Sequence, residues 1–271
     1  MAIWGSDAAP NEAPPRQHDV RVSALRWYDL VLLPLGAAGF ALVTGLFLVL
    51  ADWIFLAPDG ATPGQWARSV SSSVWFAYAL QIALYAGVVL TGFALLRWRG
   101  CRLSEVYFPR VRFRSVLAAG GLGAIFAGLF MGLLSLLPPE TQQQLIEQSE
   151  LLSPTSGGEA LALLFLAVLL APLAEELYFR GVMLRLLSEK MRFVTSASLT
   201  AILFSLSHGH LFVLPGPGGW ALTGLLFTVG FVFAALARFT GSLRVPVVMH
   251  GAYNAVLLAP GVTAVFNGLP F

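Results

Sequence analysis

Three ionisable side chains lie together at the end of a strongly apolar run. Residues 160–170 carry no polar side chain, and Glu175, Glu176 and Arg180 follow within the next ten positions. If this segment lies in lipid, each centrally placed charge disfavours insertion by roughly 2.5–3.5 kcal/mol. Such charges are kept where they are paired or used in a reaction, so the cluster is a candidate functional site. The alternative is an ion pair that only locks helix packing.

Helical spacing separates the two carboxylates of this cluster. Glu176 and Arg180 are four residues apart on one helix face, with the acid N-terminal to the base. The 3.6-residue period turns Glu175 by about 100° from Glu176. We therefore predict that Arg180 pairs with Glu176 and that Glu175 remains free for chemistry. The alternative is that Glu175 is a solvated acid at the cytoplasmic end of the helix.

Further polar residues interrupt two later apolar stretches. His208 follows Phe204 by four residues, with His210 just beyond it, and His250 and Asn254 lie four apart on one helical face. Each histidine alone is compatible with a hydrogen-bonding role in packing. Polar groups on three separate spans converge on each other or on water, so we expect them to share one site.

The composition is that of a polytopic membrane protein. Hydrophobic residues make up 57% of the 271 positions and charged residues 11%, and the mean hydropathy is +0.77. Soluble domains carry about 25% charged residues, so a soluble domain is excluded. The single cysteine, Cys101, rules out an internal disulfide and a cysteine-based metal site. Residues 1–25 are polar, show no signal-peptide pattern and predict a disordered cytoplasmic tail.

The apolar stretches predict an all-α, polytopic transmembrane helical bundle of about seven spans. In the third span, Gly128 and Gly132 form a GxxxG step that is compatible with close helix packing. The predicted spans cover residues 28–51, 74–96, 115–137, 159–179, 193–214, 220–237 and 245–260. They divide the chain into three N-terminal spans (26–137), an outer acidic loop (138–158), a helical core with the polar clusters (159–260) and a C-terminal tail (261–271).

Basic residues give the predicted orientation. In a seven-span arrangement, 15 of the 16 lysines and arginines lie in every second connecting segment and therefore on the same side of the membrane. Only Arg68 lies on the opposite side. Positive residues favour the cytoplasm, so the N-terminus is predicted inside and the C-terminus outside. The basic segment 97–114 is expected to contact anionic lipid headgroups. The acidic segment 138–158 is either an amphipathic helix or a solvated connection, and we favour the connection.

The polar clusters, taken in order, resemble the motifs of a known protease family. Glu-Glu-x-x-x-Arg, Phe-x-x-x-His and His-x-x-x-Asn are similar to those of the CAAX protease and bacteriocin-processing (CPBP, or Abi) family, related to the type II CAAX prenyl endopeptidases. The resemblance covers residues 159–260 and implies an intramembrane glutamic endopeptidase without a cofactor. By that resemblance, the residues that activate water are Glu175 and His208, those that stabilise the oxyanion are His250 and Asn254, and those that support them are Glu176, Arg180 and Phe204.

Other functions use the same residue types. Two histidines and a glutamate form a catalytic zinc set, although the sequence has no His-Glu-x-x-His motif. A proton-coupled transporter also places acids and histidines in its spans, but we find no inverted repeat. A third alternative is a non-catalytic scaffold or immunity protein that retains the motif residues without catalytic activity. The expected partners are a membrane-associated peptide or protein, lipidated or bacteriocin-like, and the lipid bilayer, with no nucleic acid. The expected location is a bacterial inner membrane.

Overall fold

The computed structural model describes residues 25–57, 60–102, 104, 107–149, 153–214 and 216–268. Every long regular element in these ranges is a helix, which confirms the all-α prediction. The predicted disorder of residues 1–24 lies outside the described residues. The helices are α2 (Asp29–Leu56), α3 (Pro63–Ser71), α4 (Val74–Trp98), α6 (Phe113–Ser135), α7 (Pro139–Ser149), α8 (Gly157–Leu164), η2 (Phe165–Leu170), α9 (Ala171–Glu176), η3 (Leu177–Met183), α10 (Leu184–Ser188), α11 (Phe193–Ser207), α12 (His210–Val213), α13 (Pro217–Thr240) and α14 (Arg244–Phe266).

Six helices in the described chain are long and apolar enough to cross a membrane. They are α2, α4, α6, the continuous helix from α8 to α10, α13 and α14. With the shorter apolar helix α11, they agree with the prediction of about seven spans. The stretch predicted as 193–214 is divided, however. Gly209 takes a positive φ of 78° just after α11, which stops the helix, and α12 follows as a short turn.

Two segments predicted without helix contain helix. The acidic segment 138–158 contains α7, with Pro139 in its first turn and Glu140 near the positive end of the helix dipole. The helix alternative for this segment is therefore the correct one. The segment from residue 261, predicted as a tail, continues α14 to Phe266. Pro260 lies inside that helix rather than at its end, as prolines in membrane helices can.

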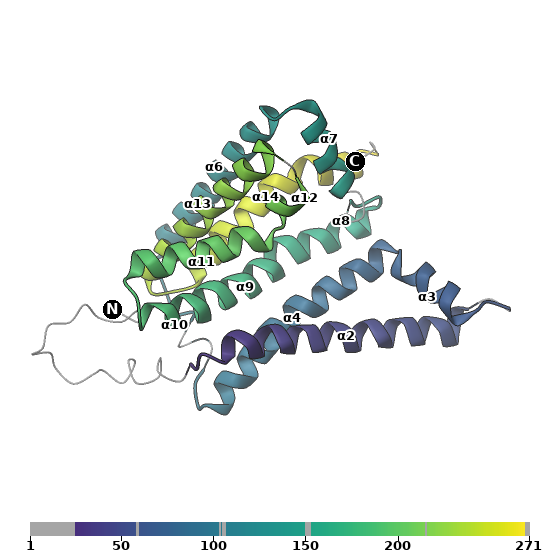
Figure 1. The fold of residues 1–271 in the computed structure, drawn as a ribbon, viewed down its shortest axis with the longest axis horizontal. Helices are drawn as coiled ribbons and strands as arrows, with labels where there is room; N and C mark the ends of the chain where they lie inside the picture. Colours follow the sequence, from purple (N-terminus) through teal and green to yellow (C-terminus); the bar gives the residue numbers. More distant parts are fainter. Residues whose placement is uncertain are drawn as a thin grey trace, which may run out of the picture.

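The continuous helix from α8 to α10, called the central helix below, lies between two groups of helices (Figure 1). The α2–α4 pair packs on one side of it, and α6, α11, α13 and α14 lie on the other. The approach of α4 is close, since a Cβ added at Gly92 would lie 3.1 Å from the Leu177 side chain. Polar residues on the central helix are therefore placed between the N-terminal pair and the remaining helices.

The segment between α4 and α6 packs against basic residues at one end of the bundle. Tyr107 is fully buried there, and its carbonyl accepts a hydrogen bond from the Leu243 amide (2.8 Å). The Arg185 guanidinium lies 4.4 Å from the Tyr107 ring centroid, and burial raises the pKa of Tyr107 to about 12. Arg244 Nε donates to the Phe108 carbonyl (2.9 Å). Basic segments that are far apart in the sequence therefore meet at this end.

The central helix changes its hydrogen-bond register twice. Its η2 and η3 segments are π-helical, so the Ala171 amide donates to the Leu166 carbonyl and the Leu184 amide to the Phe179 carbonyl, each five residues back. These segments flank the six-residue α9, whose last two residues are the two glutamates. Single π turns within α-helices are frequent at functional sites. The two glutamates therefore lie between the two π-helical segments, and Arg180 lies within the second of them.

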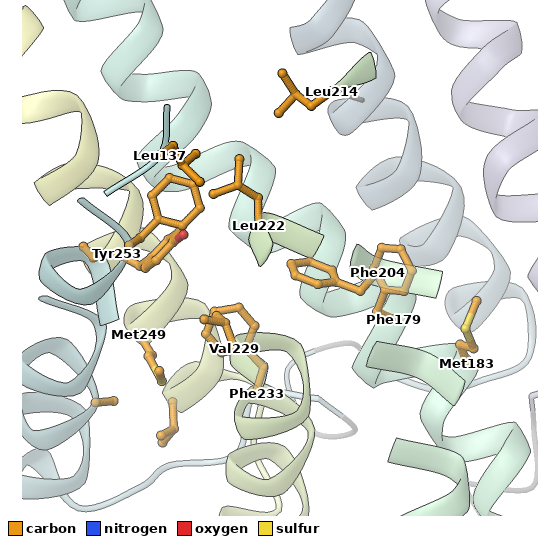
Figure 2. Packing of buried hydrophobic residues seen from close by; sticks show 14 residues of the cluster. Leu137, Phe179, Met183, Phe204, Leu214, Leu222, Val229, Phe233, Met249 and Tyr253 are labelled. Atoms are coloured by element: carbon orange, nitrogen blue, oxygen red, sulfur yellow. The ribbon is translucent and has the colours of Figure 1, made fainter. Parts of the chain in front are cut away.

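A buried aromatic cluster joins the central helix to α11 and α13. The Phe204 ring packs edge to face with those of Phe179 and Phe233, at centroid distances of 5.3 and 6.0 Å. Met249 and Tyr253 of α14 belong to the same cluster, which fills the space between these helices (Figure 2). This cluster packs the central helix, α11 and α14, which carry the three predicted motifs, against one another and against α13.

Close packing of α6 against α14 depends on Gly123. A Cβ at this position would lie closer than 3.0 Å to the Met249 carbonyl oxygen, so a larger residue would push the helices apart. The predicted GxxxG step at Gly128 and Gly132 does not serve this purpose, because an added Cβ at either position meets no atom within 4 Å. The glycine on which the packing of α6 against α14 depends lies five residues before the motif.

We expect Gly123→Ala to lower the melting temperature in detergent, because α6 and α14 must separate to admit the methyl group. Gly128→Ala is the matched control on the same helix. It should leave the melting temperature unchanged or slightly raised, since alanine is the better helix former. Melting curves of both purified variants check this. The packing interpretation fails if the two variants melt alike.

Candidate active site

Glu176 and Arg180 form a fully buried ion pair. Both side chains are 0% exposed, and Arg180 Nη1 donates to Glu176 Oε1 over 2.8 Å. The structure therefore forms the pair that the four-residue spacing predicts. Removing either partner would leave an uncompensated charge in the interior, which is strongly unfavourable.

An aromatic cage and a backbone carbonyl surround the rest of Arg180. Its Nη2 donates to the Gly230 carbonyl (2.9 Å), and its guanidinium carbon lies 4.4 Å from the Phe204 ring centroid and 5.1 Å from that of Phe233. Gly230 permits this approach, because an added Cβ would lie 3.2 Å from Nη2. Arg180 thereby connects the central helix to α11 and α13.

His250 lies between the two glutamates. Its Nδ1 is 3.2 Å from Glu176 Oε1, and its Nε2 is 3.9 Å from Glu175 Oε2. An ionised carboxylate only accepts hydrogen bonds, so Nδ1 carries a hydrogen. Nε2 then faces Glu175 across a separation longer than a hydrogen bond. The ring stacks on Phe233 with centroids 4.9 Å apart, which fixes the plane of the imidazole.

Glu175 is the carboxylate that faces a cavity. Its side chain is 17% exposed, and its Oε1 accepts a hydrogen bond from the Tyr85 hydroxyl of α4 (2.9 Å). Its Oε2 is buried and accepts no hydrogen bond from any described residue. Buried polar atoms generally have a hydrogen-bond partner. Oε2 can therefore accept a further hydrogen bond, and the side chain lines the larger of the two cavities described below.

His208 follows the last residue of α11 and has one ring nitrogen in use. Its Nδ1 lies 2.8 Å from the Phe204 carbonyl, which only accepts, so Nδ1 donates. In the neutral ring Nε2 then carries no hydrogen and can accept a hydrogen bond. His208 and Glu175 line one cavity, so the structure brings these two predicted residues to the same space.

Asn254 is anchored to the backbone of the central helix. Its Nδ2 donates to the Ala167 carbonyl (2.7 Å). In the π register of η2, that carbonyl would bond to the amide five residues on, which belongs to Pro172 and has no N–H. Asn254 therefore supplies the hydrogen-bond donor that the helix lacks at this point. The second hydrogen of its side-chain amide can still be donated to another acceptor. Gly251 allows the approach, because a Cβ there would lie within 3.0 Å of the Val168 carbonyl oxygen.

Two cavities adjoin at His208, which lines both. The larger has a volume of about 320 Å³ and lies between the α2–α4 pair, the central helix and α11. The smaller has a volume of about 140 Å³ and lies between α11, α13, α14 and α6. Besides His208, the polar residues that line the larger cavity are Tyr85, Glu175, Tyr178 and Ser207, and those that line the smaller are His210, His250, Tyr253 and Asn254.

Sequence reasoning missed three tyrosines of the site. Tyr85 bonds to the predicted base from a helix outside all of the motifs. Tyr178 donates to the α2 carbonyl that Pro34 leaves without its helical partner (3.1 Å). Tyr253 has a buried hydroxyl that bonds to no described residue, and it lines the smaller cavity. The one usable signal in the sequence is the three-residue spacing of His250 and Tyr253, which places both on one face of α14.

We expect Glu176→Gln and Arg180→Ala each to destabilise the protein by about 3–5 kcal/mol, because each leaves the other member of the buried ion pair without its counter-charge. Arg192→Ala, which removes an exposed arginine, is the control and should melt like the parent. Melting curves in detergent measure the effect. If a Glu176 or Arg180 variant is as stable as the parent but inactive, then the structural role assigned to Glu176 and the catalytic role assigned to Glu175 are wrong.

The motif-bearing part of the chain also matches a known family. Residues 157–256 match the family model described as type II CAAX prenyl endopeptidase Rce1-like. No curated protein and no solved structure matched this chain. The matched range contains every site residue predicted from the sequence and leaves α2, α4 and α6 outside it. Residues 157–256 are therefore similar to the Rce1-like type II CAAX prenyl endopeptidases, in agreement with the three motifs.

Proposed function

We propose that this protein is an intramembrane endopeptidase in which Glu175 activates a water molecule. The observation that supports this most is the different surroundings of the two glutamates. Glu176 is neutralised by Arg180 in the interior, whereas Glu175 lacks an arginine partner and faces the larger cavity. The family matched by residues 157–256 is a protease family, which supports hydrolysis of a peptide bond.

The proposed reaction is the addition of water to a peptide carbonyl. Glu175 Oε2 takes a proton from the water, whose oxygen bonds to the carbonyl carbon, and the carbonyl oxygen becomes an oxyanion. His208 lines the same cavity and helps to orient the water through Nε2. The proton then passes to the amide nitrogen and the C–N bond breaks, which gives a carboxyl group and an amine.

His250 and Asn254 are the proposed donors to the oxyanion. Asn254 would use its second amide hydrogen, because the first is bonded to the Ala167 carbonyl. His250 would donate through Nε2 in its doubly protonated form, because Nδ1 already serves Glu176. Both residues line the smaller cavity, so the oxyanion is assigned to that side of His208.

The proposed substrate is a membrane-associated peptide or protein rather than a nucleic acid. Most residues that line the larger cavity are apolar, which suits a lipidated or otherwise hydrophobic peptide. The meeting of Arg185, Arg244 and the segment between α4 and α6 at one end supports a cytoplasmic N-terminus. The alanine-, glycine- and arginine-rich sequence supports a bacterial inner membrane as the location.

The proposed reaction uses no metal ion. A zinc site needs three or four side chains grouped around one point. Among the described residues, no three His, Cys, Asp or Glu side chains form such a group. Zinc catalysis by the same residues is the alternative that a direct experiment must test.

We expect Glu175→Gln to reduce peptide cleavage by at least about 100-fold with folding retained, because an amide cannot accept the proton of water. Glu189→Gln, which changes an exposed glutamate directly after the central helix, is the control and should remain active. Cleavage of lipidated and unlipidated peptides by purified protein measures both. Full activity of a well-folded Glu175→Gln protein would rule out this residue as the base.

We expect activity to persist in the presence of chelators and to require no stoichiometric metal. Elemental analysis of the purified protein and assays with and without chelator check this. Zinc at one per chain, lost together with activity in His208→Ala and His250→Ala, would establish the zinc alternative instead. Chelator-resistant activity of metal-free protein would support the glutamate mechanism.

A further inference from the structure

We propose that Tyr85 is a positioning residue for Glu175. This inference rests on the proposed function, because it assigns Tyr85 a role in holding the base. Tyr85 lies on α4, outside the family-matched segment and 90 residues from Glu175 in the sequence. Its hydroxyl donates to Glu175 Oε1 over 2.9 Å, and both residues line the larger cavity.

The hydrogen bond from Tyr85 gives the two oxygens of the Glu175 carboxylate different roles. Oε1 is held by Tyr85, and Oε2, which bonds to no described residue, is left on the side of His250, 3.9 Å from its Nε2. A carboxylate that rotates freely would present either oxygen to the substrate in many orientations. One fixed oxygen restricts this rotation, so the other keeps a constant direction toward the reacting water.

The packing of α4 makes Tyr85 a rigid donor. Gly87, two residues further along α4, allows the α2 backbone to approach, since an added Cβ would lie 2.8 Å from the Ala37 Cα. Gly92, seven residues after Tyr85, allows the close contact with Leu177 of the central helix. Close contacts on both sides therefore fix α4 between α2 and the central helix, whether or not the tyrosine hydroxyl is present. The hydroxyl is accordingly not needed to hold the helices together.

Tyr85→Phe removes the hydroxyl and keeps the ring that lines the cavity. We expect kcat to fall by about 10- to 100-fold, as for loss of a hydrogen bond to a charged group, with KM and the melting temperature nearly unchanged. Tyr78→Phe is the matched control, because Tyr78 lies seven residues earlier on the same face of α4 and lines neither cavity. Its kcat should equal that of the parent. An unchanged kcat in Tyr85→Phe, with the parent active, overturns the proposal.

A double-mutant cycle separates positioning of Glu175 from a direct effect on the substrate. Glu175→Asp keeps a carboxylate but withdraws it by one methylene from Tyr85. In that background Tyr85→Phe should change the residual kcat less than about twofold, because the hydrogen bond is already lost. An equal fold-change in the parent and in Glu175→Asp would show that Tyr85 acts independently of Glu175, which overturns the proposal.

A spectroscopic measurement tests the contact without any activity. The infrared carboxylate band of Glu175 is identified in the detergent-solubilised protein by its loss in Glu175→Gln. Tyr85→Phe should shift that band, and Tyr78→Phe should leave it in place. A band that Tyr85→Phe does not move overturns the proposal. If the parent cleaves no peptide but the band shifts, the proposed function fails while the assigned contact between Tyr85 and Glu175 stands.

Discussion

A guanidinium with no exposed surface, such as that of Arg180, must find its partners inside the protein. It finds the Glu176 carboxylate on its own helix, the Gly230 carbonyl on α13 and the face of Phe204 on α11. Each partner comes from a different helix, so the charge is satisfied only when these helices hold their relative positions. Once Glu176 is held in this way, it in turn receives Nδ1 of His250 from α14. The ion pair is thus the point at which the polar site and the helical packing depend on each other.

The same arrangement separates two adjacent glutamates into different environments. Glu176 points into the interior and is neutralised there, whereas Glu175 points toward the larger cavity between the central helix and the α2–α4 pair. The family-matched segment supplies the motif residues, but α4 supplies the hydroxyl that binds Glu175. The candidate active site is therefore incomplete without the N-terminal helices, which carry none of the motifs.

Irregular backbone also contributes to the site. Pro172 and the π register of η2 deprive the Ala167 carbonyl of its helical partner, and Asn254 supplies the missing donor. In α2, Pro34 has the same effect, and Tyr178 supplies the donor from the central helix. In both cases an unpaired carbonyl in an apolar bundle is satisfied by a side chain from another helix. These bonds place the helices on either side of the glutamates at a defined distance from the central helix.

Local sequence patterns predicted the class of the protein, most of the spans and the motif residues, because hydrophobic length and four-residue helical spacing are local properties. The Glu176–Arg180 pair follows from that spacing alone. Local patterns could not reveal that the 193–214 stretch is divided, because the break depends on the left-handed conformation of one residue, Gly209. They also could not assign Tyr85 to Glu175, since 90 residues separate the two and only the packing of α4 against the central helix brings them together. The packed bundle decided that the Glu176–Arg180 pair is fully buried and that Glu175 faces a cavity, because burial depends on contacts between helices.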